Sequence, residues 1–235
     1  MSRRHEADPP ILLDLFCGGG GSAEGYRRVG FHVIGVDIED HSRAFARIGC
    51  EFHRMSWEAG LARFGHLADA VHASCPCQRY SRASICRPGL AARYPDLIAP
   101  VRTALAETGL PSVIENVPGA PLVNPVMLCG SMFGLRAEFS GHGTVGLQRH
   151  RLFESSLPLT APGGCRHELP ALRVFGHGRP GNSDLTGPGY AQASRDAMGV
   201  WWMTRDQLNE AIPPAYAEHV GRQLMAALSQ GARAA

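Results

Sequence analysis

The sequence predicts an α/β fold built around a mostly parallel β-sheet, with a very small loop-rich insert toward its C-terminal end. Three observations support this class. Short apolar runs alternate with helical segments, the first run ends in a glycine-rich turn, and chemically reactive residues follow the ends of several runs. Alternating strands and helices indicate βαβ units and a parallel sheet. Such sheets bind ligands at the carboxyl ends of their strands.

The first predicted unit is a strand over 11–16, a glycine-rich turn, and a helix over 23–29. A second strand over 31–36 ends at Asp37, close to the ~20-residue spacing from the glycine turn at which an acidic residue holds ribose hydroxyls. Glycines in this turn let a cofactor approach backbone amides closely. The pattern fits a dinucleotide as well as S-adenosylmethionine.

The third strand, over 70–73, ends at Ser74-Cys75-Pro76-Cys77. A helix over 97–108 then leads to a strand over 111–114, which ends at Glu115-Asn116. A cysteine and a carboxylate at neighbouring strand ends can face one ligand.

The domain organisation follows from a change of character along the chain. We expect a catalytic and cofactor-binding α/β domain over 11–155 and a target-recognition insert, rich in glycine and proline, over 156–194. A C-terminal segment over 195–230 should return to the catalytic domain, with a final helical segment over 208–228 that is entered through Pro213-Pro214.

Composition restricts the class of protein. The chain of 235 residues is 44% hydrophobic, enough for a core, and its net charge is only +2. It contains no lysine, so its 23 basic residues are all arginine. GC-rich codon usage explains this, and so does the use of planar guanidinium groups for phosphate and base contacts. Without a membrane-length apolar run or an apolar leader, we expect a cytoplasmic protein that does not bind membranes.

The seven cysteines are odd in number and irregularly spaced, which argues against a disulfide framework. The zinc candidates are Cys75, Cys77, Cys86, Cys165 and His167. The chain has no C-x-x-C pair, which weakens the case for structural zinc. The sequence therefore favours a protein without a metal.

Several motifs resemble those of the DNA cytosine-5 methyltransferase family, particularly its small phage-type members. Residues 14–21 match the family's cofactor motif, 76–78 its nucleophile motif and 115–117 its acid motif. Residues 148–151 resemble the basic motif and 211–214 the last motif, so the match spans roughly 11–224 in the family's order.

The resemblance implies a Rossmann-like fold and methyl transfer from S-adenosyl-L-methionine to carbon 5 of cytosine in double-stranded DNA, with S-adenosyl-L-homocysteine as product. A thiolate that adds at carbon 6 activates carbon 5 for methylation. Cys77 would be this nucleophile, and Glu115 the acid at ring nitrogen 3. Arg149 and Arg151 would orient the base, and their positive field would favour the thiolate.

On the cofactor side, the resemblance implies that Phe16 and Ile38 sandwich the adenine and that Asp37 holds the ribose. The chain departs from the family at Cys75, Ser56 and Leu147, where a proline, an acidic residue and a glutamine are usual. The full expected cofactor set is Asp14, Phe16, Cys17, Gly18, Gly19, Gly20, Asp37, Ile38, Ser56, Trp57, Pro76, Ala211 and Ile212.

The substrate contacts are expected on the loop after the nucleophile, beside the acid, and on the insert. They are Gln78, Arg79, Ser81, Arg82, Asn116, Val117, Arg173 and Arg179. A short insert presents few side chains to base edges, so a site of roughly two to four base pairs is expected. We also expect a monomer in the cytoplasm of a bacterium or phage-infected cell. An RNA cytosine-5 methyltransferase and a catalytically silent DNA-binding relative stay open as alternatives. A nicotinamide dehydrogenase would explain the glycine turn but not the nucleophile motif.

Overall fold

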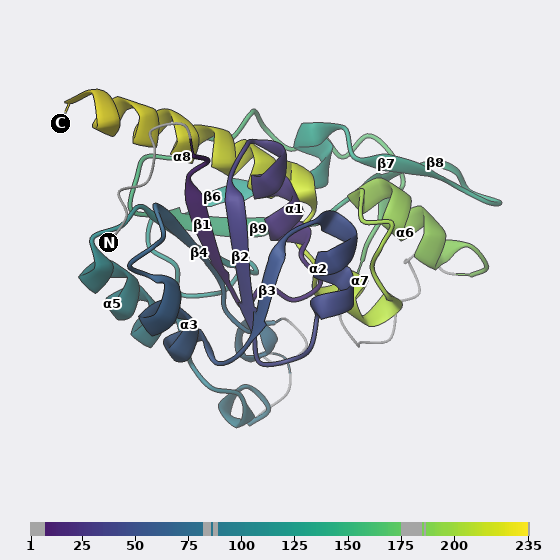
Figure 1. Cartoon of the computed structure of the whole chain (residues 1–235). Coiled ribbons are helices and arrows are strands. Elements are labelled where there is room, and N and C mark those ends of the chain that lie inside the picture. The colour runs from purple at the N-terminus through teal and green to yellow at the C-terminus, as the bar shows by residue number, and fades with distance from the viewer. Residues whose placement is uncertain (1–7, 82–85, 87–88, 175–184, 186, 235) are drawn as a thin grey trace.

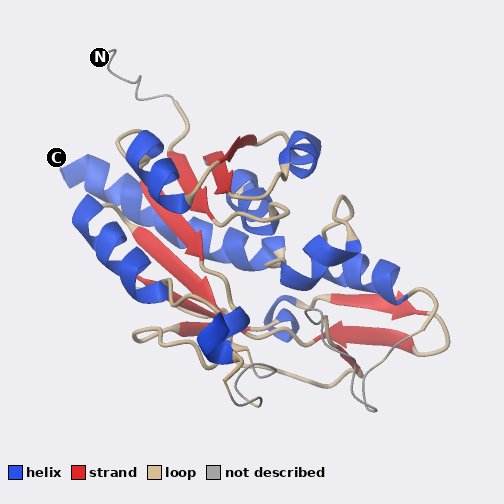
Figure 2. Ribbon diagram, turned by 90° about the horizontal axis from the view of Figure 1, so that it is seen from below, coloured by secondary structure: helices blue, strands red, loops and turns tan. Residues whose placement is uncertain are grey.

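The computed structural model describes residues 8–81, 86, 89–174, 185 and 187–234. Within them, one sheet of seven strands has the order β3-β2-β1-β4-β5-β9-β6, and a smaller sheet has the order β10-β8-β7. Figure 1 shows helices packed around the larger sheet, and Figure 2 shows the β7–β8 ribbon to one side of it.

The larger sheet contains the first six described strands of the chain together with β9. Its strands are β1 (Ile11–Leu15), β2 (His32–Asp37), β3 (Glu51–Arg54), β4 (Ala70–Ser74), β5 (Ser112–Asn116), β6 (Val126–Leu128) and β9 (Arg151–Ser155). The smaller sheet comprises β7 (Arg136–Phe139), β8 (Gly143–Leu147) and β10 (Ala171–Leu172). The α-helices are α1 (Gly21–Arg28), α2 (Ser42–Ile48), α3 (Trp57–Phe64), α5 (Ile98–Thr108), α6 (Tyr190–Met198), α7 (Arg205–Glu210) and α8 (Pro214–Ala234).

The order of the strands places a ligand-binding edge at the centre of the sheet. β1 lies between β2 and β4 and pairs with both in parallel. The chain runs from β1 to β2 and β3 on one side, then crosses to β4 and β5 on the other. Such a switch point opens a crevice at the carboxyl ends of the two central strands. Because β9 is antiparallel to β5, its first residue, Arg151, lies at this same edge.

Apolar residues of the central strands alternate between the two faces of the sheet. Leu12 and Val33 pack into a core with side chains of α1, α2 and α8, whereas Leu13 and Ile34 pack with side chains of α3 and α5. Helices α1 and α8 approach closely because α1 carries Gly25, where a Cβ would lie 2.3 Å from the carbonyl oxygen of Pro214.

The α/β class with a mostly parallel sheet is confirmed, and the four predicted strands are β1, β2, β4 and β5. The final helical segment expected over 208–228 divides into two helices: α7 ends at Glu210, and α8 begins at Pro214, within the expected point of entry. Proline disfavours helical backbone at the residue before it but suits the first position of a helix, so Pro213-Pro214 separates the two helices.

The region expected to be a loop-rich insert is irregular in 156–174 except for β10, and its last residues already belong to α6. β10 pairs with β8, so the smaller sheet joins the expected insert to the expected catalytic domain. The domain division itself stays a prediction. None of the helices in the described part of the chain has the length and apolar character needed to cross a membrane.

Candidate active site

The glycine-rich turn after β1 is held by the end of β2. The backbone N–H of Gly18 donates to Oδ2 of Asp37 over 2.9 Å, and the N–H of Glu39 donates to Oδ1 of the same carboxylate over 3.0 Å. A Cβ at Gly18 would meet no atom of the described residues within 4 Å, so these residues leave space beside the turn. The structure thus places Asp37 next to the glycine turn, as its spacing in the sequence indicates.

Phe16 adopts a backbone conformation that non-glycine residues rarely take, with φ of 58°. Such a conformation costs on the order of 1–3 kcal/mol and is typical of functional sites. Its ring lies 6.3 Å from that of Trp57, centroid to centroid, whereas Ile38 is 68% exposed. Ser56 caps α3 by accepting a hydrogen bond from the N–H of Ala59, so its hydroxyl has a structural partner.

Asp14 is fully buried beneath the turn, and burial raises the pKa of this carboxyl to about 7. Its Oδ2 accepts a hydrogen bond from the Ser22 hydroxyl over 2.7 Å. Its Oδ1 has no hydrogen-bond partner among the described residues. A buried acceptor without a partner costs about 1–3 kcal/mol, so this atom is a candidate for a ligand contact.

The C-terminal segment supports the turn from the other side. The indole N–H of Trp202 donates to the carbonyl oxygen of Gly19 over 2.8 Å, and a Cβ at Gly21 would lie 2.2 Å from the carbonyl oxygen of Ile212. Ala211 and Ile212 are buried here. Sequence reasoning missed Trp202, because no local pattern signals a contact with a residue so distant along the chain.

Cys77 lies past β4, at the start of the short 3₁₀ helix η1 (Gln78–Tyr80). Burial raises the pKa of its thiol above the ordinary value, Arg151 and Arg149 lower it in part, and Glu115 raises it further. The arginines favour the thiolate, as expected, but in the free protein the loss of water outweighs their positive field and the pKa of the thiol stays above its ordinary value. Cys75 and Pro76 precede it, Cys75 being buried.

Glu115 lies at the end of β5, buried next to Arg151, whose Nε is 3.0 Å from its Oε1. Burial raises the pKa of this carboxyl above its ordinary value, while Arg151, Arg149 and a hydrogen bond from Ser74 lower it in part. Oε1 has no hydrogen-bond partner of good geometry in the described structure. The acid expected from the sequence is thus held near the thiol, with its pKa raised by burial.

A series of buried side-chain hydrogen bonds connects Tyr26, in α1, to Glu115. The hydroxyl of Tyr26 lies 2.9 Å from Nδ1 of His72, and Nε2 of His72 lies 2.8 Å from the hydroxyl of Ser74. Burial lowers the pKa of His72 to about 3, so this imidazole is neutral. Sequence analysis did not predict this series of hydrogen bonds. The position of His72 inside an otherwise apolar strand was a signal that could have revealed it.

Arg149 has a different environment from Arg151. Its Nη1 and Nη2 donate to the carbonyl oxygens of Val174 and Asn209, over 2.6 and 2.8 Å. Burial is the main reason that the pKa of Arg149 falls to about 9. Its Nε has no hydrogen-bond partner in the described residues. Arg149 therefore links the insert and the C-terminal segment to the site.

The expected substrate contacts divide into several groups. Arg79 donates to the carbonyl oxygen of Tyr94 over 2.9 Å, linking η1 to the turn η2 (Ala91–Arg93), and the hydroxyl of Ser81 donates to Gln78. The Asn116 side chain donates to the carbonyl oxygen of Cys75 over 2.9 Å and accepts from the N–H of Val117. These two hydrogen bonds fix the loop that carries Cys77.

The remaining expected contacts lie on the loop after Cys77 and on the insert. Arg173 is exposed, and its carbonyl oxygen accepts a hydrogen bond from the Tyr190 hydroxyl. Arg82 and Arg179 lie outside the described residues.

The described buried polar atoms that lack a hydrogen-bond partner belong to residues of the candidate site. In the described residues, the buried side-chain nitrogen and oxygen atoms without a hydrogen-bond partner are Asp14 Oδ1, Glu115 Oε1 and Arg149 Nε. Buried polar groups are nearly always hydrogen-bonded, so an orphaned one needs an explanation. All three belong to residues that the sequence assigned to cofactor or catalysis.

Neither a protein-family model nor a curated protein sequence matches this chain. Among solved structures, it is similar to an S. pombe Dnmt2 methyltransferase, with a TM-score of 0.60 and 11% identity over 93% of this chain and 99% of that one. It is also similar to the Entamoeba histolytica methyltransferase EhMeth, with a TM-score of 0.58 and 11% identity over 94% of this chain and 99% of that one. The likeness shows that the chain has a Rossmann-like fold that methyltransferases adopt.

Proposed function

We propose that this protein transfers a methyl group from S-adenosylmethionine to carbon 5 of cytosine in DNA, through a transient covalent bond between Cys77 and the base. The observation that carries the proposal is the meeting of Cys77, Glu115 and Arg151 at the carboxyl edge, where burial raises the pKa of the acid. The likeness to methyltransferase folds supports it.

The chain's own residues account for the chemistry at the base. The Cys77 thiolate adds to carbon 6, which makes carbon 5 nucleophilic enough to take up a methyl group. Glu115, in its protonated form, shares its proton with ring nitrogen 3 and so offsets the charge that develops there. Loss of the carbon 5 proton to a base then expels the Cys77 thiolate and restores the aromatic ring. Because the free thiol is protonated, it must lose its proton when the substrate binds.

The residues around the glycine turn fit the cofactor. S-Adenosylmethionine supplies an electrophilic methyl group when bound. The open space beside Gly18, the partnerless Asp14 Oδ1 and the exposed Ile38 together offer room, a polar contact and an apolar surface. Asp37 keeps the turn in place and would accept hydrogen bonds from ribose hydroxyls.

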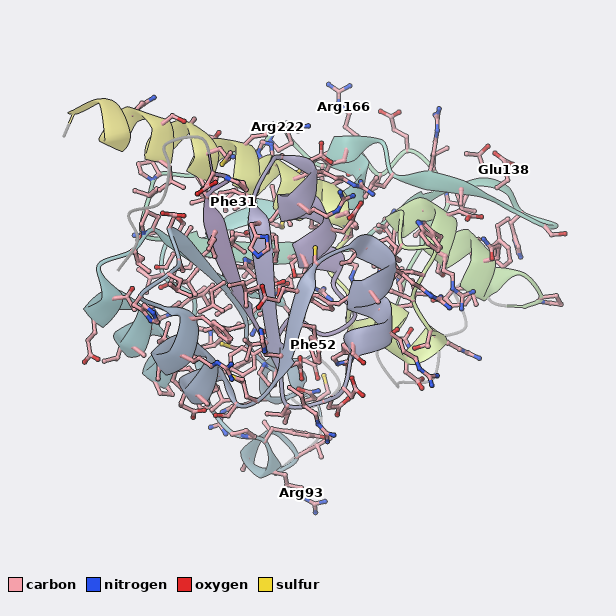
Figure 3. All side chains as sticks on the ribbon, viewed as in Figure 1. Phe31, Phe52, Arg93, Glu138, Arg166 and Arg222 are labelled. Atoms are coloured by element: carbon pink, nitrogen blue, oxygen red, sulfur yellow. The ribbon has the colours of Figure 1, made fainter. Side chains whose placement is uncertain are left out.

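A DNA substrate agrees with the charge around the nucleophile. A cytosine must leave the duplex before Cys77 can reach it. Arg93, on η2, extends away from the molecule (Figure 3), and the hydrogen bond from Arg79 to Tyr94 links η2 to η1, which follows Cys77. Arginine side chains in this position suit phosphate contacts that hold the DNA in register.

Mass spectrometry of nucleosides tests the substrate directly. The purified protein is incubated with S-adenosylmethionine and either duplex DNA or folded RNA, and 5-methylcytosine is measured in each. We expect the product in DNA, and bisulfite sequencing should then locate it. Product in RNA alone would favour the RNA alternative, and cofactor and DNA binding without product in either would favour the silent relative.

Asp37→Ala is expected to weaken S-adenosylmethionine binding by about 1–3 kcal/mol, the scale of a lost charge-assisted hydrogen bond. The variant loses the acceptor that also holds the N–H of Gly18. Calorimetry measures the effect, and Asp40→Ala is the matched control, because this neighbouring carboxylate accepts only from the start of α2. Tight binding of NAD, with none of S-adenosylmethionine, would contradict the cofactor assignment.

A further inference from the structure

Four metal-binding side chains lie together outside the residues assigned to methyl transfer. They are Cys129, His150, Cys165 and His167, and their sulfur and nitrogen atoms all lie within 4.8 Å of one another. Nε2 of His167 is 3.3 Å from Sγ of Cys129, and Nε2 of His150 is 3.4 Å from Sγ of Cys165. Each sulfur thus faces an imidazole nitrogen.

This donor set matches a tetrahedral zinc site. With Zn–S bonds of about 2.3 Å and Zn–N bonds of about 2.0–2.1 Å, tetrahedral ligand atoms lie about 3.3–3.8 Å apart. The two sulfur–nitrogen distances fall in this range, and the remaining pairs need only a small contraction. Two thiolates and two imidazoles form a ligand set typical of structural zinc.

The fold, not a local motif, assembles the four residues. Cys129 follows the carboxyl end of β6, and His150 directly precedes β9, with which β6 pairs. Cys165 and His167 come from the irregular segment 156–174 and lie against this edge. The two cysteines, Cys129 and Cys165, lie far apart in the sequence, which explains why a search for C-x-x-C spacing predicts no metal.

A second layer of hydrogen bonds surrounds the buried sulfur. The hydroxyl of Ser131 donates to Sγ of Cys129 over 3.4 Å, and the backbone N–H of Arg166 donates to the Ser131 hydroxyl over 3.1 Å. Groups of this kind orient the ligands of metal sites. Cys129 is fully buried, whereas His167 is exposed and the neighbouring Arg166 points into solvent (Figure 3), so a metal can enter from the surface.

We propose that Cys129, His150, Cys165 and His167 bind one structural zinc ion. Four protein ligands leave no open position, so the ion holds structure and does not activate water. It joins the segment 156–174 to the residue between Arg149 and Arg151. The metal thereby fixes the expected recognition insert relative to the catalytic arginines.

Metal analysis of the purified protein tests this assignment independently of methyl transfer. Expressed with zinc and kept reduced, the wild type should contain about one zinc per chain. Cys165→Ser and His167→Ala should each lower the zinc affinity more than about 100-fold, beyond the usual effect of outer-layer groups. Cys86→Ser is the control and should retain the metal, because this exposed cysteine is outside the cluster.

Cobalt provides a second measurement that needs no variant to fold. Co²⁺ added to the reduced, zinc-depleted wild type should give the intense visible absorption of tetrahedral coordination, with a thiolate-to-metal band at higher energy. A wild type that takes up neither metal would overturn the proposal. So would full zinc retention by both ligand variants, or a Cys129–Cys165 disulfide in the protein isolated under native conditions.

Discussion

Cys77→Ser should reduce 5-methylcytosine formation in DNA by on the order of 10³-fold or more, the scale seen when a covalent nucleophile is lost. Serine keeps the size of the side chain, but its hydroxyl forms an anion far less readily than a thiol does. Because Cys77 is partly exposed and has no structural hydrogen bond from its side chain among those described, the fold should persist. Circular dichroism and S-adenosylmethionine binding check this.

DNA that contains 5-fluorocytosine makes the covalent step visible. Fluorine cannot leave carbon 5 as a proton does, so the wild type should remain attached to the DNA after methyl transfer. Denaturing gels should show this adduct in the wild type and in Cys50→Ser, whose half-buried sulfur lies outside the site. An adduct of equal yield in Cys77→Ser would show that another residue is the nucleophile.

Glu115→Gln should lower kcat by on the order of 10²–10⁴-fold while DNA affinity changes little, because a positioned acid contributes about this much. Glutamine has nearly the same shape and can still accept a hydrogen bond from Ser74, but it has no acidic proton to transfer to ring nitrogen 3. Single-turnover kinetics separate this step from binding. Glu138→Gln, at an exposed position on β7 (Figure 3), is the matched control and should retain wild-type kcat. A kcat within about threefold of wild type in Glu115→Gln would rule out an acid role.

The raised pKa of Glu115 also gives stability a definite pH dependence. The folded protein holds this proton more tightly than the unfolded chain, so the contribution is fully present below the ordinary pKa. It is lost as pH rises through the raised pKa of the folded state. Glutamine cannot ionise, so urea denaturation of Glu115→Gln should show a flatter decline in the free energy of unfolding across this interval. If the free energy of unfolding of Glu115→Gln varied with pH as in the wild type, Glu115 would not be the group that takes up this proton.

Local patterns were sufficient for the elements that begin the chain. A short apolar run followed by a turn residue specifies a strand and the turn after it, because both depend on residues close together in the sequence. This pattern found the strands that precede the glycine turn, Asp37, Cys77 and Glu115. The parallel sheet then places these strand ends at one edge. At the C-terminal end, Pro213-Pro214 marked the entry to α8, but the apolar pattern continues across the break and so did not reveal α7 as a separate helix.

Long-range packing decided the remainder of the site. The sequence supplied Cys77, Glu115 and the arginine pair, but only the fold turned the Arg149 guanidinium toward Val174 and Asn209 while Arg151 reached Glu115. The charge state of Cys77 depends on how much water the packed chain excludes, a quantity that residue spacing does not contain.

The sequence by itself therefore determined the α/β class, the four strands whose ends carry the expected site, and the nature of the reactive groups. Only the tertiary structure decided that Trp202 holds the glycine turn, that His72 and Ser74 stand behind Glu115, and that four distant cysteines and histidines meet. These contacts join residues far apart in the chain. Their geometry follows from the antiparallel entry of β9 and the return of the C-terminal segment, which no local pattern encodes.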